Sequence, residues 1–311
     1  MKRRRFIKNS LLAGIGSVLA SPFISDNQKA HAIIKPAHTP EPENWSDNNI
    51  TLTWIGHSTI LLNFYGTWIL TDPVFFERIG IYWLNTNWGP SRFSHPALDI
   101  DKIPKPDIML LSHAHMDHMD YLTLKEFANK FPNQIDFVTA LNTSDVIEDL
   151  PWKSIKELDW NDSYSLNSIN ITAKEVKHFG WRYPWENDRS KGNFKNGRSY
   201  NAYILEKNGK KVLFGGDTAF MNKFENIYDK DIDISIMPIG AYRPWRWNHC
   251  NPEEALIMTD KIKAKYFIPI HTFTFEQGQE PREEALAWLN TSAVNYNIKI
   301  GLSEIGQTFS I

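Results

Sequence analysis

The sequence predicts a single α/β domain of four layers, α/β/β/α, in which two packed β-sheets lie between outer helices. Short apolar runs typical of strands alternate with stretches of helical periodicity, and no Pro/Ser/Gly-rich linker divides them. Residues 59–72 and 202–217 share one pattern: a strand, a tight turn, a second strand and then an aspartate. Two related halves predict two sheets. The 311 residues, 42 % hydrophobic, suffice for such a core.

Local patterns predict the individual elements. Runs rich in β-branched and apolar residues predict strands, and two of these runs meet at the tight turn Tyr65-Gly66. The predicted strands are 51–55, 59–63, 67–71, 108–112, 135–139, 169–176, 201–206, 211–214, 232–238 and 266–270, and the predicted helices are 122–130, 252–264 and 281–290. Asn208-Gly209 predicts a hairpin turn, and Asn251 followed by Pro252 predicts a helix N-terminus.

Residues 1–32 have the pattern of an export signal. A basic segment, residues 2–8, precedes an apolar stretch, residues 11–20, that is shorter than the about 20 residues needed to span a bilayer. The order Arg-Arg-x-Phe-Ile-Lys resembles a twin-arginine signal, so we expect periplasmic export, with membrane association as an open alternative. Cleavage could follow Ala32 or Ala20, and an uncleaved anchor is the alternative. Residues 33–50 are expected to be an extended lead-in to the domain at 51–311.

Composition excludes several classes of protein. The whole chain has 34 basic and 36 acidic residues, and without residues 1–32 these numbers become 28 and 35, a net charge of −7. Such a surface argues against nucleic-acid binding, which depends on Lys and Arg contacts with phosphates. The single cysteine, Cys250, excludes an intrachain disulfide and a Cys-rich zinc site.

The most informative segment is residues 112–118, Ser-His-Ala-His-Met-Asp-His, which directly follows an apolar run. It places four potential metal ligands, His113, His115, Asp117 and His118, where a buried strand ends in a loop. Imidazole and carboxylate groups are common ligands of first-row divalent metals.

The His-x-His-x-Asp-His motif after a strand resembles that of the metallo-β-lactamase superfamily, which implies the metallo-β-lactamase four-layer sandwich. The resemblance implies two divalent metal ions, with zinc favoured. The implied ligands are His113, His115 and His178 for the first ion, Asp117, His118 and His271 for the second, and Asp217 as a bridge. In such sites a shared hydroxide is the nucleophile, and Asp117 could orient it and take its proton.

Further motifs are similar to those of the N-acylphosphatidylethanolamine-hydrolysing phospholipase D family and its bacterial relatives. These motifs lie at residues 54–59, 70–75, 89–93, 117–121, 157–160, 214–218, 238–242 and 251–255, and the similarity spans about 51 to 287. It implies hydrolysis of a phospholipid phosphodiester by the bridging hydroxide. His249 aligns with a histidine near the family's site and could bind phosphate or protonate the leaving group; the alternative is a helix-capping role.

Aromatic clusters at residues 75–88, 181–185 and 245–247 could face acyl chains or a membrane, and Arg182, Arg243 and Arg246 could meet anionic head groups. Ordinary core or loop packing and solvated arginines are the alternatives. We therefore expect a phospholipid or small-ester substrate, with peripheral membrane contact through aromatic loops and no nucleic-acid partner. A homodimer is one open oligomeric state. His57 and His95 are interpreted as structural or supporting residues.

Other functions remain open. A lactonase or amidase, including a β-lactamase, would keep the metals and change the bond that is cleaved. A nuclease is disfavoured by the net charge of −7. His115 disfavours the redox branch of the superfamily, which typically has Glu there. A non-catalytic exported metal-binding protein is the contrasting class.

Overall fold

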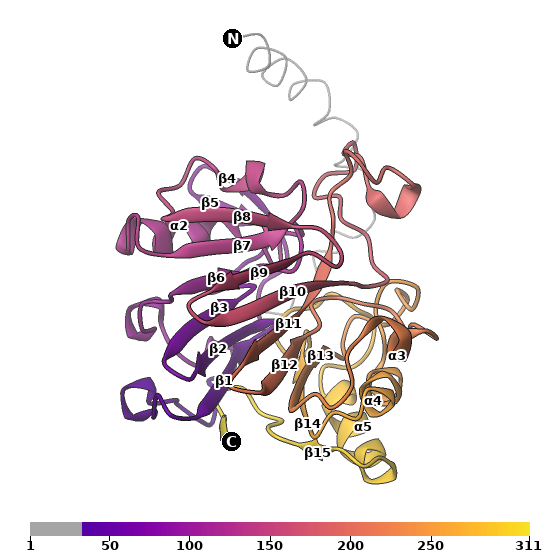
Figure 1. Ribbon diagram of the computed structural model, residues 1–311. Coiled ribbons are helices and arrows are strands. Elements are labelled where there is room, and N and C mark those ends of the chain that lie inside the picture. Colours follow the sequence, from indigo (N-terminus) through magenta and orange to yellow (C-terminus); the bar gives the residue numbers. More distant parts are fainter. Residues whose placement is uncertain (1–32) are drawn as a thin grey trace. The chain divides into compact units, whose positions relative to one another are not determined.

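Two seven-stranded β-sheets form the centre of the structure, a computed structural model that describes residues 33–311 (Figure 1). The first sheet has the strand order β16-β1-β2-β3-β6-β7-β8, and the second has the order β15-β14-β13-β12-β11-β10-β9. A separate hairpin is formed by β4 and β5. The export signal predicted at residues 1–32 lies outside the described residues. Among the described residues, no helix has both the length and the apolar character needed to cross a membrane.

The bounds of the elements are as follows. The first sheet contains β1 (Ile50–Gly56), β2 (Thr59–Phe64), β3 (Thr67–Thr71), β6 (Ile108–Leu110), β7 (Asp136–Ala140), β8 (Ser154–Leu158) and β16 (Thr308–Ser310). The second contains β9 (Ser163–Leu166), β10 (Ile169–Glu175), β11 (Asn201–Lys207), β12 (Lys210–Phe214), β13 (Ile234–Pro238), β14 (Tyr266–Ile270) and β15 (Lys299–Ile300). The hairpin strands are β4 (Ile81–Trp83) and β5 (Thr86–Trp88), and the α-helices are α2 (Tyr121–Lys130), α3 (Phe224–Ile227), α4 (Pro252–Lys261) and α5 (Glu284–Ser292).

Alternation along the strands explains the four layers. In β11, Tyr203 and Leu205 belong to the apolar core shared with the first sheet, whereas Ala202 and Ile204 belong to the core under α4 and α5. Successive side chains of a strand point to opposite faces, so one strand serves both cores. Figure 1 shows α2 on the outer side of the first sheet and α4 and α5 on the outer side of the second. The predicted α/β/β/α arrangement of the metallo-β-lactamase fold is confirmed.

Several strands run parallel, and their carboxyl ends carry the loops of interest. In the first sheet β3, β6 and β7 are parallel neighbours, and in the second β12, β13 and β14 are parallel neighbours. Parallel neighbours end at the same edge of a sheet. The loops that follow β3 and β6, and those that follow β12 and β14, therefore emerge at common edges.

The local predictions are largely confirmed, with shifted ends. The hairpin turn has positive φ at both Asn208 and Gly209, as a type I′ turn requires. Helix α4 begins with a capping box in which Asn251 and Glu254 each bond the other's backbone N–H. The predicted helix 252–264 ends at Lys261, and the predicted helix 281–290 covers Glu284–Ser292. The β4–β5 hairpin, β8, β9, β15 and β16 were not predicted.

Candidate metal centre

The predicted ligands come from loops at the carboxyl ends of strands. The loop after β6 contributes His113, His115, Asp117 and His118, whereas Asp217 follows β12 and His271 follows β14. His178 follows β10, which runs in the same direction as β12 because both pair antiparallel with β11. The structure brings all seven predicted residues together in two adjoining groups.

The first group consists of His113, His115, His178 and Asp217. His115 Nδ1 lies 2.8 Å from His113 Nε2 and 3.2 Å from His178 Nε2. Asp217 Oδ2 lies 3.7 Å from His178 Nε2 and 4.0 Å from His113 Nε2. Three imidazole nitrogens and one carboxylate oxygen therefore converge on a single small space, which is the number of ligands in a tetrahedral zinc site.

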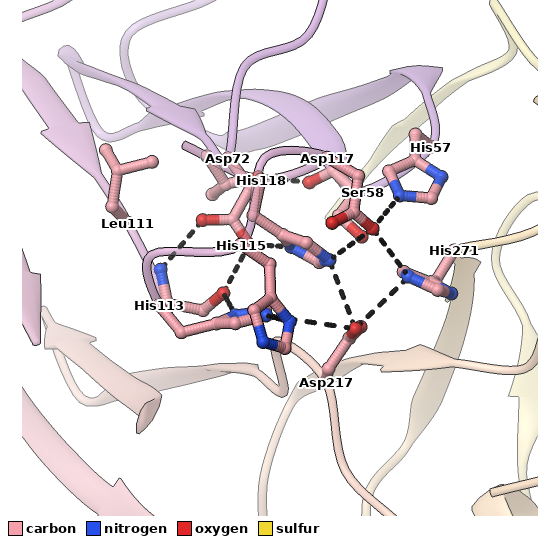
Figure 2. A network of polar contacts seen from close by, with 12 residues as sticks. His57, Ser58, Asp72, Leu111, His113, His115, Asp117, His118, Asp217 and His271 are labelled. Carbon is pink, nitrogen blue, oxygen red and sulfur yellow. Dashed lines mark hydrogen bonds and ion pairs between the residues drawn. The ribbon is translucent and has the colours of Figure 1, made fainter. Parts of the chain in front are cut away.

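The second group consists of Asp117, His118 and His271, with His57 beside them. Asp117 Oδ2 lies 3.3 Å from both His118 Nε2 and His271 Nε2. These same two nitrogens are each 3.1 Å from Asp217 Oδ2 (Figure 2). Asp217 thus contacts histidines of both groups, and this is the position that a bridging ligand would need.

The buried polar atoms fit metal ions. Both carboxylate oxygens of Asp217, together with His118 Nε2 and His115 Nε2, are buried and have no well-aligned hydrogen-bond partner among the described residues. Buried polar groups without such a partner are costly, and buried charges are normally paired or coordinate metals. The donor set of imidazoles and carboxylates suits zinc and other first-row divalent ions. The clusters are consistent with a binuclear metal site.

Electrostatics divide the histidines into two kinds. Burial lowers the pKa of His115 to about 3 and the pKa of His113 well below its ordinary value, so these rings are neutral, the form that binds metal. Burial opposes charge on His271 too, but the nearby Asp217 and Asp117 raise its pKa to about 9. The pKa of His118 is also raised, against burial, by Asp217, Asp117 and Asp72. Without metal, protons on His118 and His271 therefore balance the carboxylates.

Asp72, which directly follows β3, holds the loop that carries His113 and His118 through hydrogen bonds. Its carboxylate accepts hydrogen bonds from Ser112 N at 2.7 Å, Ser112 Oγ at 2.5 Å and His118 Nδ1 at 2.7 Å. Ser112 Oγ in turn lies 2.8 Å from His113 Nδ1. Carboxylates that hold the second nitrogen of a ligating histidine fix its orientation. The sequence placed Asp72 in a motif without giving it a role; its position after a strand parallel to β6 is the only signal.

Gln277 was missed as a site residue, whereas His57 was expected in a structural or supporting role. His57 Nε2 lies 3.0 Å from Asp117 Oδ2, and Gln277 Nε2 donates to the same oxygen at 2.6 Å. His57 follows Gly56, and it adopts a positive φ of 50° between β1 and β2. This uncommon conformation for a non-glycine residue is the local sign of a specialised position. His95, by contrast, is exposed.

His249 lies at the edge of the centre. It is buried, and its Nδ1 is 3.8 Å from Asp217 Oδ2. The carbonyl of its neighbour Asn248 lies 3.0 Å from His178 Nδ1. Helix α4 is capped by Asn251, so the structure gives the capping role to Asn251 and not to His249. A cavity of about 320 Å³ opens beside His271 and is lined in part by Phe273, Phe275 and Gln277.

Arg182 differs from expectation. It is buried, and its Nη1 donates hydrogen bonds of 2.8 Å to the carbonyls of Ala114 and Met119. Arg182 thus fixes the shape of the ligand-bearing loop and is not available to an anionic head group. Arg243 and Arg246 are exposed, and they form ion pairs with Glu284 and Glu254.

Comparisons with known proteins agree with this architecture. The model of the beta-lactamase superfamily domain matches residues 67–272, more than half of the chain. The metallo-beta-lactamase fold protein YhfI from Bacillus subtilis has a similar structure, with a TM-score of 0.60 and 14 % identity, covering 85 % of this chain and 99 % of YhfI. This likeness concerns the fold.

Two curated relatives are distant homologues. One is N-acyl-phosphatidylethanolamine-hydrolyzing phospholipase D 1 of Caenorhabditis elegans, 28 % identical over 80 % of this chain and 72 % of the relative. The other is the mitochondrial N-acyl-phosphatidylethanolamine-hydrolyzing phospholipase D of Saccharomyces cerevisiae, 27 % identical over 75 % of this chain and 50 % of the relative. The chain therefore belongs to the metallo-β-lactamase superfamily, as a metal-dependent hydrolase with a His/Asp metal site.

Proposed function

We propose that this chain hydrolyses the phosphodiester bond of an N-acylphosphatidylethanolamine-like phospholipid, in the manner of a phospholipase D. One observation carries the proposal: two His/Asp groups joined through Asp217 lie in a chain that aligns over 80 % of its length with such an enzyme. The yeast relative supports the same substrate class. The expected products are phosphatidic acid and an N-acylethanolamine.

Two divalent metal ions, which we propose to be zinc, fit the described side chains. His113, His115 and His178 would hold one ion, and Asp117, His118 and His271 would hold the other, with Asp217 contacting both. When bound, such a pair polarises the phosphoryl group and makes water acidic enough to supply a nucleophile at neutral pH.

The chain's own groups would orient the reactants and move protons. Asp117 Oδ2 is the proposed proton acceptor for the attacking water, since it faces the centre between His118 and His271. His57 and Gln277 hold that oxygen in place. His249 lies at the edge of the centre, where its ring could bind a phosphate oxygen or give a proton to the leaving oxygen.

A metal analysis combined with a turnover screen tests the proposal. The purified protein would be assayed for bound metal and offered N-acylphosphatidylethanolamine, other phospholipids, lactones and β-lactams. We expect two equivalents of zinc and release of phosphatidic acid. Good turnover of lactones or β-lactams without any phosphatidic acid would contradict the proposed substrate class.

Asp117→Asn separates catalysis from metal binding. The amide keeps the shape of the side chain but cannot take a proton, so turnover should be lost while at least the ion held by His113, His115 and His178 is retained. His95→Ala is a matched control, because His95 is exposed and outside the centre. If the native protein binds metal and hydrolyses no ester of any class, it is a metal-binding protein without catalysis.

We also propose export through the twin-arginine signal at residues 1–32. Replacement of Arg3 and Arg4 by lysine should keep the protein in the cytoplasm, whereas the native sequence should deliver it to the periplasm. Cell fractionation measures this directly, and export of the lysine variant at the native level would contradict the proposal.

A further inference from the structure

The exposed aromatic residues are concentrated in three short segments. Among the described residues, ten large apolar side chains are exposed, and seven of them lie within residues 80–91, 179–185 and 239–250. These seven are Ile81, Trp83, Leu84, Trp88, Trp185, Trp245 and Trp247. Leu84, at the tip of the β4–β5 hairpin, is 80 % exposed, and Trp185 is 78 % exposed. We call these three segments the aromatic rim.

Each segment of the rim is attached to the metal centre. The β4–β5 hairpin is held by Asn87 Nδ2, which donates to Asp120 Oδ1 at 2.7 Å, two residues after His118. Residues 179–185 directly follow His178, and Phe179 packs on His115 with ring centroids 4.3 Å apart. Residues 239–250 contain His249. The exposed aromatic side chains therefore belong to segments that contact or contain residues of the metal centre.

The charge of the rim differs from that of the rest of the chain. Its three segments contain no Asp or Glu and two exposed arginines, Arg243 and Arg246, which pair with Glu284 and Glu254 outside the segments. The third arginine, Arg182, is buried. Residues 33–311 as a whole have seven more acidic than basic residues. The lack of acidic residues within the segments limits repulsion from lipid phosphates, and anionic lipids attract exposed basic side chains. Tryptophan is the side chain enriched where a membrane meets water, and five of the seven exposed side chains are tryptophans.

We propose that the aromatic rim docks on the surface of a phospholipid bilayer and turns the metal centre toward the head groups. This inference rests on the proposed function, because it supplies the route by which a lipid phosphodiester reaches the centre. The rings enter the interfacial layer, and the head group meets the His113–His118 loop without leaving the membrane. The docked state is peripheral, with no segment of the rim crossing the bilayer.

Quenching of tryptophan fluorescence by brominated lipids tests this docking. Bromine on the acyl chains quenches only indole rings that enter the bilayer, and residues 1–32 contain no tryptophan. The signal therefore reports on residues 33–311 even if the export signal itself binds lipid. The full chain would be mixed with brominated phosphatidylcholine vesicles, with and without 30 % brominated phosphatidylglycerol. We expect quenching in both and tighter binding to the anionic vesicles.

A variant with Trp83, Trp88, Trp185, Trp245 and Trp247 replaced by alanine should lose this quenching and sediment with vesicles at least tenfold more weakly. The matched control is Ile155→Ala with Val294→Ala, which removes exposed apolar side chains outside the rim. The control should sediment like the native protein. Circular dichroism and the unfolding midpoint confirm that all three proteins are folded.

Several results would overturn docking. One is native protein that sediments with vesicles while its tryptophan fluorescence stays unquenched. Another is a five-site variant whose remaining tryptophans are quenched by the same fraction as those of the native protein. Dimerisation of the native protein that is lost in the five-site variant, without vesicle binding, would assign the rim to self-association. None of these measurements needs turnover, so docking can fail or succeed independently of the phosphodiesterase activity.

Discussion

The metal centre and the aromatic rim depart from the usual distribution of side chains in opposite directions. At the centre, six histidines and the carboxylates of Asp72 and Asp217 are buried, whereas a few residues away the rim exposes five tryptophans. Buried charge and exposed large apolar surface are both unfavourable for an isolated chain. We propose that each is stabilised by something outside the polypeptide: metal ions at the centre and lipid at the rim. The predictions below probe this contrast.

Asp217→Asn should have the largest effect on the centre. Asp217 contacts histidines of both groups. Metal ions contribute several kcal/mol to transition-state stabilisation, so turnover should fall roughly 10³-fold. Metal content after dialysis and phosphatidic acid release measure the effect. Asp101→Asn is the control, because the Asp101 side chain is 94 % exposed. Full activity of Asp217→Asn would show that Asp217 is not a required metal ligand.

A tryptophan buried near the metal centre should contribute far more to the stability of the fold than an exposed tryptophan of the aromatic rim. Trp54 is fully buried in β1 and its Nε1 donates to the His57 carbonyl at 2.7 Å, so Trp54→Ala should lower the free energy of unfolding by about 3–5 kcal/mol. Trp88→Ala in the rim should change it by less than about 0.5 kcal/mol. Denaturant unfolding measures both. Equal losses would mean that the rim is part of the packed core.

Arg182→Met tests a residue that lies in a rim segment but whose side chain supports the ligand-bearing loop. The change leaves the carbonyls of Ala114 and Met119 without their donor, so the free energy of unfolding should fall by about 2–3 kcal/mol. Arg246→Met should be nearly neutral, because Arg246 is exposed and its ion pair with Glu254 is at the surface. Thermal and denaturant unfolding measure the stability of both variants. Equal free energies of unfolding for Arg182→Met and Arg246→Met would argue against a supporting role for Arg182.

Asp72→Asn should have a smaller effect, confined to metal affinity. The amide keeps the side-chain shape but loses the negative charge that orients His118 through Nδ1. Loss of such a partner typically weakens metal binding about 10–100-fold. Competition with a chromophoric chelator measures the affinity. Asp149→Asn is the control, because the Asp149 side chain bonds Tyr121 and is not one of the clustered residues. Unchanged zinc affinity would show that Asp72 supports the backbone alone.

Much of the fold was predictable because its signals are local. Strand runs such as β3 and β6, the Asn208-Gly209 turn and the Asn251 cap depend on neighbouring residues. Four of the predicted ligands were found because they lie within six residues. The other three were found because the family resemblance implied ligands at later strand ends, and these strands are recognisable in the sequence.

What could not be predicted depends on contacts between distant segments. His57 meets Asp117 across sixty positions, and Arg182 meets Ala114 across sixty-eight. An arginine between tryptophans in a loop has the local pattern of an exposed residue, so its burial is visible only in the fold. The β4–β5 hairpin was missed because Leu84-Asn85 is a turn with positive φ at both residues and without glycine.

Hydrolysis in water enriched in oxygen-18 tests the central claim most directly. Zinc-loaded protein would be incubated with N-acylphosphatidylethanolamine vesicles, and both products would be analysed by mass spectrometry. Attack of water on phosphorus predicts one labelled oxygen in the phosphatidic acid and none in the N-acylethanolamine. Label in the N-acylethanolamine, or turnover of lactones without any phosphatidic acid, would contradict a lipid phosphodiesterase of this kind.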